Sequence, residues 1–404
     1  MHLNPHKNKV EFIVLIALMM ALNAVAIDIM LPALPIIGDE LGAKSDNDQQ
    51  LMLTLYLVGF GLSQLFYGPL SDSIGRRPVV FIGTILFLVP VAVAPFSPDY
   101  STLLALRFFQ GLGAGASRVI ATSIVRDRFE GRAMAEIMSL IMMIFMAMPI
   151  IAPSLGQVII IVSTWHFTFL FMAAMAIITL CWAYFRLPET LPPDKRKSFS
   201  LQSVATSFSL VLRHRYAISQ TLANMFLLGT VLGFLGISPL IYLNIYDLGV
   251  LYPLMIAFTA SSLAIASLIN SRLVRKFGPE RIAISATLGF AILAALWSAT
   301  AWQIGILPLW MFIAFHQPLM LCFGFAGTNQ ITCAMQPLGK VAGTASSTIG
   351  FFQTAGGAAV GAGIGYFYDG TILPVTLGFT LCGVIAFTLM LLSKPKEVQA
   401  EPAN

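Results

Sequence analysis

Residues 68–78 read GPLSDSIGRRP and join two long apolar runs, 49–70 and 77–96. A short polar turn between apolar runs of about twenty residues is typical of two consecutive membrane-spanning helices. Gly75 permits a sharp turn, and the final proline suits the first turn of the next helix, where no N–H is needed. Asp72 and the two arginines can form ion pairs at the membrane surface. We therefore predict two membrane-spanning helices joined by a charged turn. The simplest role for this turn is that its basic residues anchor the topology of the chain in the membrane.

The composition of the whole chain is that of a membrane protein. Of its 404 residues, 57% are hydrophobic and 10% are charged, whereas soluble domains carry about 25% charged residues. Only helices and closed barrels satisfy backbone hydrogen bonds in lipid, and these apolar runs do not alternate with a period of two, so we predict helices. The twelve predicted spans are 12–36, 49–70, 77–96, 100–124, 135–160, 163–186, 215–243, 250–271, 281–301, 304–334, 342–367 and 371–393.

Positive charges are confined to alternate connections between these spans. Of the 23 Lys and Arg residues, only Lys44, Arg107 and Arg118 lie outside the N-terminus, the even-numbered loops, the C-terminus and the helix ends beside them. Acids such as Asp99 and Asp369 occupy the odd-numbered loops. By the positive-inside rule, both termini are predicted to be cytoplasmic in a bacterial inner membrane. The net charge of +5 therefore reflects topology, and we expect no nucleic-acid partner.

A polar stretch from residue 188 to 214 interrupts the apolar pattern. It includes a basic cluster at 192–197, which suits contact with anionic lipid headgroups. We expect this stretch to be a cytoplasmic linker between two six-helix bundles, residues 1–187 and 215–404. At the N-terminus, the apolar run from Phe12 is too long for the core of a signal peptide, so we expect it to be retained as the first helix.

The stretch 68–78 closely resembles the GxxxDxxGRR signature of the major facilitator superfamily. The resemblance implies the major facilitator fold, an all-α membrane protein of twelve transmembrane helices in two six-helix bundles around a central cavity. It also implies that the stretch acts in gating. The residues concerned are Gly68, Asp72, Gly75, Arg76 and Arg77. The equivalent stretch of the second half is degenerate, since Ser271 and Arg275 replace the expected glycine and aspartate.

A second motif, RFFQGLGA at residues 107–114, resembles the RxxQGxGAA motif of proton-driven members of that superfamily. It adds Gln110 and Gly111 to the predicted gate. Arg118 follows Arg107 by eleven residues, so both lie on one helix face about 16 Å apart. A guanidinium in lipid costs at least about 2.5 kcal/mol, so each arginine needs a cavity or a partner. The alternatives are that Arg107 binds backbone carbonyls between helices and that Arg118 snorkels toward the surface.

Asp28 is the one acid, of the 18 in the chain, that lies well inside an apolar span. The segment from Asn23 to Pro35 resembles the DxxLPxLP opening of the drug:proton antiporters. Helix geometry places Asp28 and Arg107 at similar depth, each about 10 Å from the outer helix end. Burial favours a protonated carboxyl and a nearby guanidinium favours the ionised one. A movement that separates the two would therefore change proton affinity, and we predict that this pair couples transport to protons. A permanent ion pair that only stabilises the fold is the alternative.

Residues 148–157 read MPIIAPSLGQ and resemble the antiporter motif GPxxGG, with alanine and glutamine in place of the first and last glycines. The motif marks exporters, and such variants are typical of the bicyclomycin/chloramphenicol-resistance subgroup. The two prolines predict a bend, and the glycine predicts close helix packing, although a purely structural kink is the alternative. The motif adds Pro149, Pro153 and Gly156 to the predicted gate.

Several polar or polarisable side chains within the spans are candidate substrate contacts. Methionines on the fifth span would form an adaptable apolar surface, as in a promiscuous pocket. Polar side chains in a span bind either a substrate or a neighbouring helix, and the sequence leaves both readings open. The candidates are Asn23, Tyr56, Gln64, Arg118, Met146, Asn224, His316, Gln317 and Asn329. Among them, His316 is a second candidate proton carrier.

These features predict a proton-coupled multidrug efflux transporter that works by alternating access, as a monomer in the lipid bilayer. The expected partners are small-molecule drugs and protons. Alternatives are an exporter of a metabolite, siderophore or amino acid, and a proton symporter or non-transporting sensor. The sequence has no phosphate-binding loop, nucleophile elbow or HExxH motif, so we expect no enzyme activity, cofactor or metal. Finally, Cys181, Cys322, Cys333 and Cys382 are expected to be reduced and buried.

Overall fold

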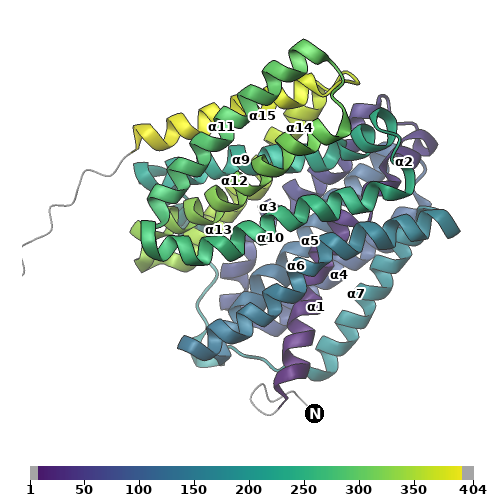
Figure 1. Cartoon of the computed structure of the whole chain (residues 1–404). Coiled ribbons are helices and arrows are strands. Elements are labelled where there is room, and N and C mark those ends of the chain that lie inside the picture. Colours follow the sequence, from purple (N-terminus) through teal and green to yellow (C-terminus); the bar gives the residue numbers. More distant parts are fainter. Residues whose placement is uncertain (1–7, 394–404) are drawn as a thin grey trace, which may run out of the picture.

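The computed structural model describes residues 8–393, and every regular element within them is helical (Figure 1). The helices of the first half are α1 (Lys9–Asp28), α2 (Leu34–Leu41), α3 (Leu51–Ile74), α4 (Arg76–Val93), α5 (Tyr100–Arg128), α6 (Gly131–Val162) and α7 (His166–Arg186). Two short 3-10 segments, η1 (Leu31–Ala33) and η2 (Asp46–Gln50), lead into α2 and α3.

The second half begins with a helix inside the predicted linker. Its helices are α8 (Leu201–Arg213), α9 (Arg215–Pro239), α10 (Tyr252–Phe277), α11 (Pro279–Ile304), α12 (Leu309–Met335), α13 (Ala342–Phe351), α14 (Gly357–Tyr366) and α15 (Leu373–Leu392). A π-helical segment, η5 (Leu240–Ile245), extends α9, and another, η8 (Phe352–Gly356), joins α13 to α14.

Ten helical segments of the described chain are long and apolar enough to cross a membrane. Two more crossings fall outside that group for physical reasons. Helix α5 carries Arg107 and Arg118, which lower its hydropathy, and the eleventh span is divided into α13, η8 and α14. Together they fit the predicted twelve. The predicted boundaries differ from the helix ends by up to six residues. The eighth span continues to Phe277, and the tenth begins at Leu309, after Gly305 with φ of 77° has ended α11.

The helices assemble in two groups that follow the two halves of the chain (Figure 1). In the first group, α5 packs against both α3 and α4, and α1 packs against α6. In the second, α11 contacts α12 and α15, while α9 contacts α14. The groups meet where α3 lies along α13, η8 and α14, and where α6 contacts α10. These two seams place α1 and α9 near the middle of the molecule.

The assembly has two opposite ends, the linker face and the distal face. The linker face carries the start of α1, the turn at Gly75 and the linker with α8. The distal face carries η2 and the turns that follow α6 and α14. Helix α5 runs from the distal face at Tyr100 to the linker face at Arg128.

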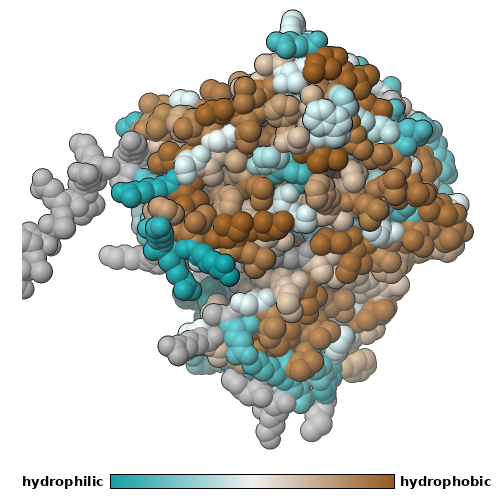
Figure 2. All heavy atoms as spheres, viewed as in Figure 1, coloured by the Kyte–Doolittle hydropathy of each residue, from teal (hydrophilic) through white to brown (hydrophobic). Residues whose placement is uncertain are grey.

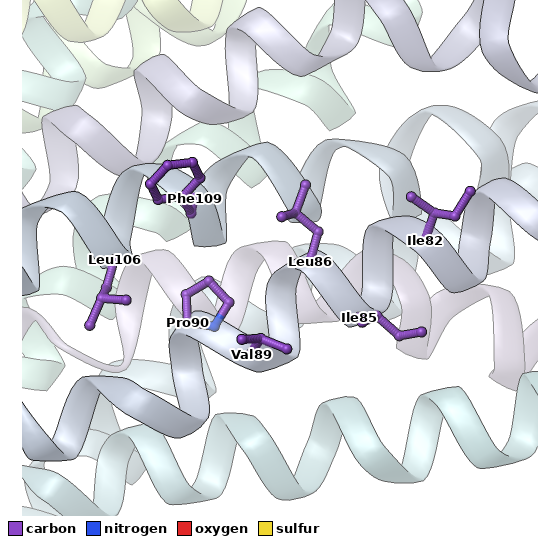
Figure 3. Close-up of a pocket in the computed structure, with 7 residues that line it drawn as sticks. All are labelled: Ile82, Ile85, Leu86, Val89, Pro90, Leu106 and Phe109. Atoms are coloured by element: carbon purple, nitrogen blue, oxygen red, sulfur yellow. The ribbon is translucent and has the colours of Figure 1, made fainter.

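The face of the molecule seen in Figure 2 is largely apolar, with hydrophilic residues mostly at its edges. Helix α4 illustrates this, since Val89 is 56% exposed. Between α4 and α5 lies an apolar groove of about 530 Å³, lined by Val89, Leu106, Phe109 and neighbouring aliphatic residues (Figure 3). All four cysteines are free. The expected burial is confirmed for Cys333 and Cys382, but Cys322 is half-buried and Cys181 is exposed, because α7 turns it outward.

The linker is more ordered than its polar sequence indicates. Helix α8 packs against α13, and the Phe208 ring stacks on Phe352 with 5.4 Å between centroids. Before α8, the linker follows the first group, because the Lys197 N–H donates to the Asp72 carbonyl at 2.9 Å. The linker therefore contacts both groups on one face.

Helix α6 runs through Pro149 and Pro153 and meets α1 at Gly156. A Cβ atom at Gly156 would overlap the carbonyl oxygen of Ile29, so only glycine permits this approach of the two backbones. The motif glycine is thus needed for packing directly beside Asp28.

We expect Gly156→Ala to destabilise the fold by about 1–3 kcal/mol, because the new methyl group meets backbone that cannot move aside. Gly363→Ala is the matched control, since Gly363 is also helical and a Cβ atom there would have no neighbour within 4 Å. Thermal unfolding of the two variants in detergent measures the difference. Equal midpoints would contradict the packing argument.

Candidate functional site

Asp28 lies at a break in the first membrane span. It is the last residue of α1, and Pro32 and Pro35 follow in η1 and α2. Proline lacks the N–H that would continue the helix, so the backbone changes direction here and leaves carbonyl groups free. Interrupted spans are common at ion and substrate sites of transporters.

The Asp28 carboxyl is buried and alone. Its residue is 5% exposed, and it makes no hydrogen bond or ion pair with any residue that the structure describes. Its electrostatic neighbours are Tyr56 on α3 and Tyr252 on α10. Tyr252 belongs to the second helix group, so Asp28 lies close to the boundary between the groups. An unpaired carboxylate at this depth costs several kcal/mol, which makes Asp28 a group whose charge must be neutralised during some step.

Arg107 does not pair with Asp28, although it contacts the same helix end. Its Nη2 donates to the carbonyl of Ala26 at 2.9 Å, and its Nε donates to the carbonyl of Met52 at 3.3 Å. Its Nη1 donates to Gln110 Oε1 at 2.6 Å. The side chain is 1% exposed. Arg107 therefore binds backbone carbonyls, which is the alternative prediction for it. Because Asp28 and Arg107 are not paired in this structure, their ion pair is not a permanent one.

Residues of α1, α3 and α5 pack around this guanidinium. The Tyr56 ring lies under it, 4.5 Å from Cζ to the ring centroid. Tyr56 in turn donates to Asn23 Oδ1 at 2.8 Å. Gly111 lets α5 approach α3, since a Cβ there would overlap the Tyr56 carbonyl oxygen. Asn23 and Tyr56, predicted as substrate contacts, thus form a buried bridge between α1 and α3.

Arg118 differs from Arg107 in its exposure and its hydrogen bonding. Its side chain is exposed, although protein surrounds it within the helix bundle. The guanidinium makes no hydrogen bond with a described residue, and its Cζ lies 5.7 Å from the Phe60 ring centroid. Phe109, which faces the apolar groove of Figure 3, lies nine residues earlier. Nine residues are two and a half turns, so Arg118 points away from that lipid-facing side and into the bundle.

Other predicted contact residues connect helices. Gln64 on α3 donates to Thr354 Oγ1 on η8 at 3.0 Å, which joins the two helix groups. Within the second group, Asn224 donates to the Gly327 carbonyl, Asn329 donates to Asn270, and Gln317 accepts from Ser262. These amides act as contacts between neighbouring helices here. The prediction for Met146 concerns a side chain outside the described residues.

His316 lies in an aromatic cluster of the second group. Its ring centroid is 4.1 Å from Phe234 and 5.5 Å from Phe312, and Trp297 is also near. The residue is 0% exposed, and neither ring nitrogen has a hydrogen-bond partner among the described residues. A protonated imidazole would be poorly stabilised among these rings, so the surroundings favour a neutral packing role.

The charged turn of residues 68–78 forms the predicted ion pairs through one of its two arginines, Arg76, whereas Arg77 donates to the Tyr184 carbonyl at 2.6 Å. Arg76 binds Asp72 at 2.5 Å and Asp127, at the end of α5, at 3.0 Å. Glu189 of the linker accepts the backbone N–H groups of Arg76 and Arg77 at 2.9 and 3.1 Å. Sequence reasoning missed Asp127 and Glu189, because neither lies within the motif. Gly75, with φ of 107°, provides the turn that brings these groups together.

The distal face is held closed by a second set of polar contacts that the sequence did not reveal. Asn47 donates to the carbonyl oxygens of Tyr366 and Tyr368 at 3.1 and 2.7 Å. Gln50 donates to the Ala362 carbonyl at 3.2 Å. Both side chains come from the first helix group and all three acceptors from the second. In contrast, α1 is partly exposed toward the linker face, where Val10 is 75% exposed.

No group of three or more His, Cys, Asp or Glu side chains in the described chain is arranged to hold a metal. The site therefore contains one lone carboxyl, one guanidinium bound to carbonyls and one free guanidinium, spread over α1 and α5. This arrangement can bind charge and protons, and among the described residues it lacks the adjacent nucleophile and base of a hydrolytic centre.

Comparison with known proteins gives a consistent result. Residues 16–362 match the Major Facilitator Superfamily. A bicyclomycin resistance protein homolog of Haemophilus influenzae is 26% identical over 390 residues, which cover 95% of this chain and 96% of that protein. The multidrug resistance protein MdtL of Vibrio parahaemolyticus is 28% identical over 377 residues, covering 92% and 93%. A solved POT family transporter in complex with a thioalcohol conjugated peptide shares the fold, with a TM-score of 0.74, 13% identity and 94% coverage of both chains.

The contrast between the two arginines predicts different effects of their removal on stability. Arg107→Met leaves two carbonyls and Gln110 without their charged donor, so we expect a loss of about 3–5 kcal/mol. Arg118→Met removes no hydrogen bond to the described protein and should unfold close to wild type. Heating of both variants in detergent, followed by size-exclusion chromatography, measures the difference. Equal losses in the two variants would contradict the assignment of Arg107 as a helix connector.

The distal contacts predict that this face must separate during the working cycle. We expect a short, reducible thiol cross-linker between Asn47→Cys and Tyr366→Cys to stop transport, and reduction to restore it. Each single cysteine variant, treated in the same way, controls for the substitution. Full transport by the cross-linked protein would show that this face does not open.

Proposed function

Because the chain belongs to the major facilitator superfamily, we propose that this transporter exports small-molecule drugs in exchange for protons. The observation that carries the proposal is Asp28, a buried carboxyl without a partner among the described residues, at the break in the first span. A structural acid would be paired in such a position, because an isolated charge is costly there. A proton carrier must instead remain free to gain and lose its proton.

The position of Arg107 provides a means of coupling. Its guanidinium is fixed to the carbonyl of Ala26, two residues before Asp28. A shift of α1 relative to α5 would alter the distance between this positive charge and the carboxyl, and with it the balance between the two protonation states. In this proposal, Asp28 takes up a proton while it is accessible from the distal face and releases it on the linker face.

The arrangement of charges assigns the two faces to the two sides of the membrane. The linker face carries most of the Lys and Arg residues, so we assign it to the cytoplasmic side by the positive-inside rule. The described chain begins and ends on that face, near Lys9 and Leu392. The described state is closed on the distal face through Asn47 and Gln50. We propose that the drug is collected at the linker face, in a bacterial inner membrane. We propose that the working unit is a monomer, since one chain supplies both halves of the site.

The names of the relatives support drugs as the substrates. One is named as a homolog of a bicyclomycin resistance protein and another as a multidrug resistance protein. Export of a metabolite, siderophore or amino acid by the same machinery is the second candidate function.

We expect Asp28→Asn to abolish proton coupling while drug binding persists. In proteoliposomes, wild-type protein should release protons when chloramphenicol, bicyclomycin or norfloxacin is added without a gradient, and it should move drug when a gradient is imposed. Asp28→Asn should lose both responses. Asp194→Asn, which changes an exposed linker acid, is the matched control and should keep both.

Three other outcomes would redirect the assignment. Normal coupling by Asp28→Asn would move the proton site elsewhere, with His316 the next residue to test. Accumulation of drug in the direction of the imposed proton flow would indicate a symporter. Absence of any drug response in folded wild-type protein would favour the exporter of a metabolite or a sensor.

A further inference from the structure

The Arg118 guanidinium forms no hydrogen bond or ion pair with the described residues, and its ring contact is with Phe60. Its guanidinium carries five N–H donors, and none of them makes a hydrogen bond with a described residue. The residue contributes to hydrogen bonding only through its backbone carbonyl, which accepts from Thr122 at 3.3 Å. Its Cζ lies 5.7 Å from the centroid of the Phe60 ring, and Tyr56 is an electrostatic neighbour. Every other charged group of the inner site is either tied to the backbone, as Arg107 is, or buried, as Asp28 is.

The depth of Arg118 makes this freedom costly. It lies ten residues before Arg128, where α5 ends, which corresponds to about 15 Å along the helix. A positive charge halfway into a membrane protein needs a partner or water. Among the described residues no acid pairs with it, and its side chain turns away from the lipid-facing groove. The exposed side chain of Arg118 therefore faces the inside of the helix bundle, on the side nearer the linker face.

Its surroundings resemble a binding site for an amphiphile. Phe60 offers an aromatic face beside the guanidinium. Ser63, one turn along α3, packs against Gly115, which lies one turn before Arg118 on α5. Gln64, the next residue, reaches across to Thr354 of the second helix group. Arg118 thus stands beside the contact between the two groups, where a bound molecule would touch both.

We propose that Arg118 binds the anionic group of the transported molecule, and that this transporter prefers amphiphilic organic acids and zwitterions with a carboxylate over their uncharged or cationic counterparts. This inference rests on the proposed export function and adds its substrate class. A guanidinium matches a carboxylate through two parallel N–H···O bonds, while an aromatic ring system can lie against Phe60. A permanently cationic drug would meet an unpaired positive charge at the same point.

The test compares norfloxacin, which carries a carboxylate, with its methyl ester, which has the same rings and no carboxylate. Binding is measured by equilibrium dialysis on full-length protein in phosphatidylcholine nanodiscs. Wild type should bind the acid more tightly. Arg118→Met should weaken binding of the acid by roughly 10- to 100-fold, the value of a charged hydrogen-bonded pair, and should bring acid and ester to similar affinity. Arg118→Lys keeps the positive charge but lacks the paired N–H donors of the guanidinium, so its affinity for the acid should lie between those of wild type and Arg118→Met.

Arg126→Met is the matched control, because Arg126 is another exposed arginine of α5, near the linker face. It should keep the preference for the acid. The anionic group bound by Arg118 could also come from a lipid headgroup. The same measurements in nanodiscs of phosphatidylglycerol, an anionic lipid, distinguish this source from the transported molecule. If phosphatidylglycerol removes the preference for the acid in wild type and has no effect on Arg118→Met, a lipid headgroup occupies Arg118 and the inference is overturned.

Chloramphenicol, which is neutral, separates this inference from the proposed function. Wild type that binds chloramphenicol but binds acid and ester equally would overturn the substrate class alone. Folded Arg118→Met that loses acid, ester and chloramphenicol to the same extent would show a general packing role and overturn it as well. Wild type that binds none of the three compounds would overturn both the substrate class and the drug-export function.

Discussion

The hydrogen bonds of Arg107 hold the first helix group together at its centre. One guanidinium joins the free carbonyls of α1 and α3 to Gln110 on its own helix. In a lipid environment neither the charge nor the carbonyls have water as an alternative partner, so each depends on the other. Gly111 brings the two helix backbones close enough for this contact. The positions of α1, α3 and α5 therefore follow from one buried charge.

The same constraint explains where the lone carboxyl lies. The carbonyl of Ala26 is free to accept from Arg107 because α1 ends at Asp28. Gly156 of α6 packs on Ile29 at the other side of the break. The prolines that interrupt the helix thus create a binding site for the arginine, a contact for α6 and an unpaired acid within a few residues. A carboxyl placed here lies beside the contacts of α1 with α5 and α6, so a movement of either helix relative to α1 would change its surroundings.

Polar side chains that already form hydrogen bonds between helices have a structural role, whereas those without such bonds are available to a ligand. Asn23, Asn224 and Asn329 use their side chains between helices, which is the usual role of an amide in a membrane protein. Arg118 uses none of its donors toward the described protein. Both sets are polar and lie at similar positions within the spans. What distinguishes them is the set of neighbours that packing provides, and that set also determines which side chains remain free to bind substrate.

Hydropathy and short-range patterns were enough to predict the class of fold, the approximate spans and the ion pair between Asp72 and Arg76. Each of these depends on local composition or on residues close together in the chain, so no knowledge of packing is needed. The same patterns singled out Asp28, because one acid in a long apolar run has no structural explanation.

The partner of each polar group, in contrast, depends on how the helices pack. Arg107 binds carbonyls and leaves Asp28 unpaired, Glu189 of the linker binds the charged turn, and Asn47 joins the two helix groups at the distal face. Such contacts join residues that are distant in the chain, and Asn47 and Tyr368 are 321 positions apart. The linker helix α8 was missed for a related reason, since a short amphipathic helix becomes stable mainly by packing on a surface, here α13, that other parts of the chain supply.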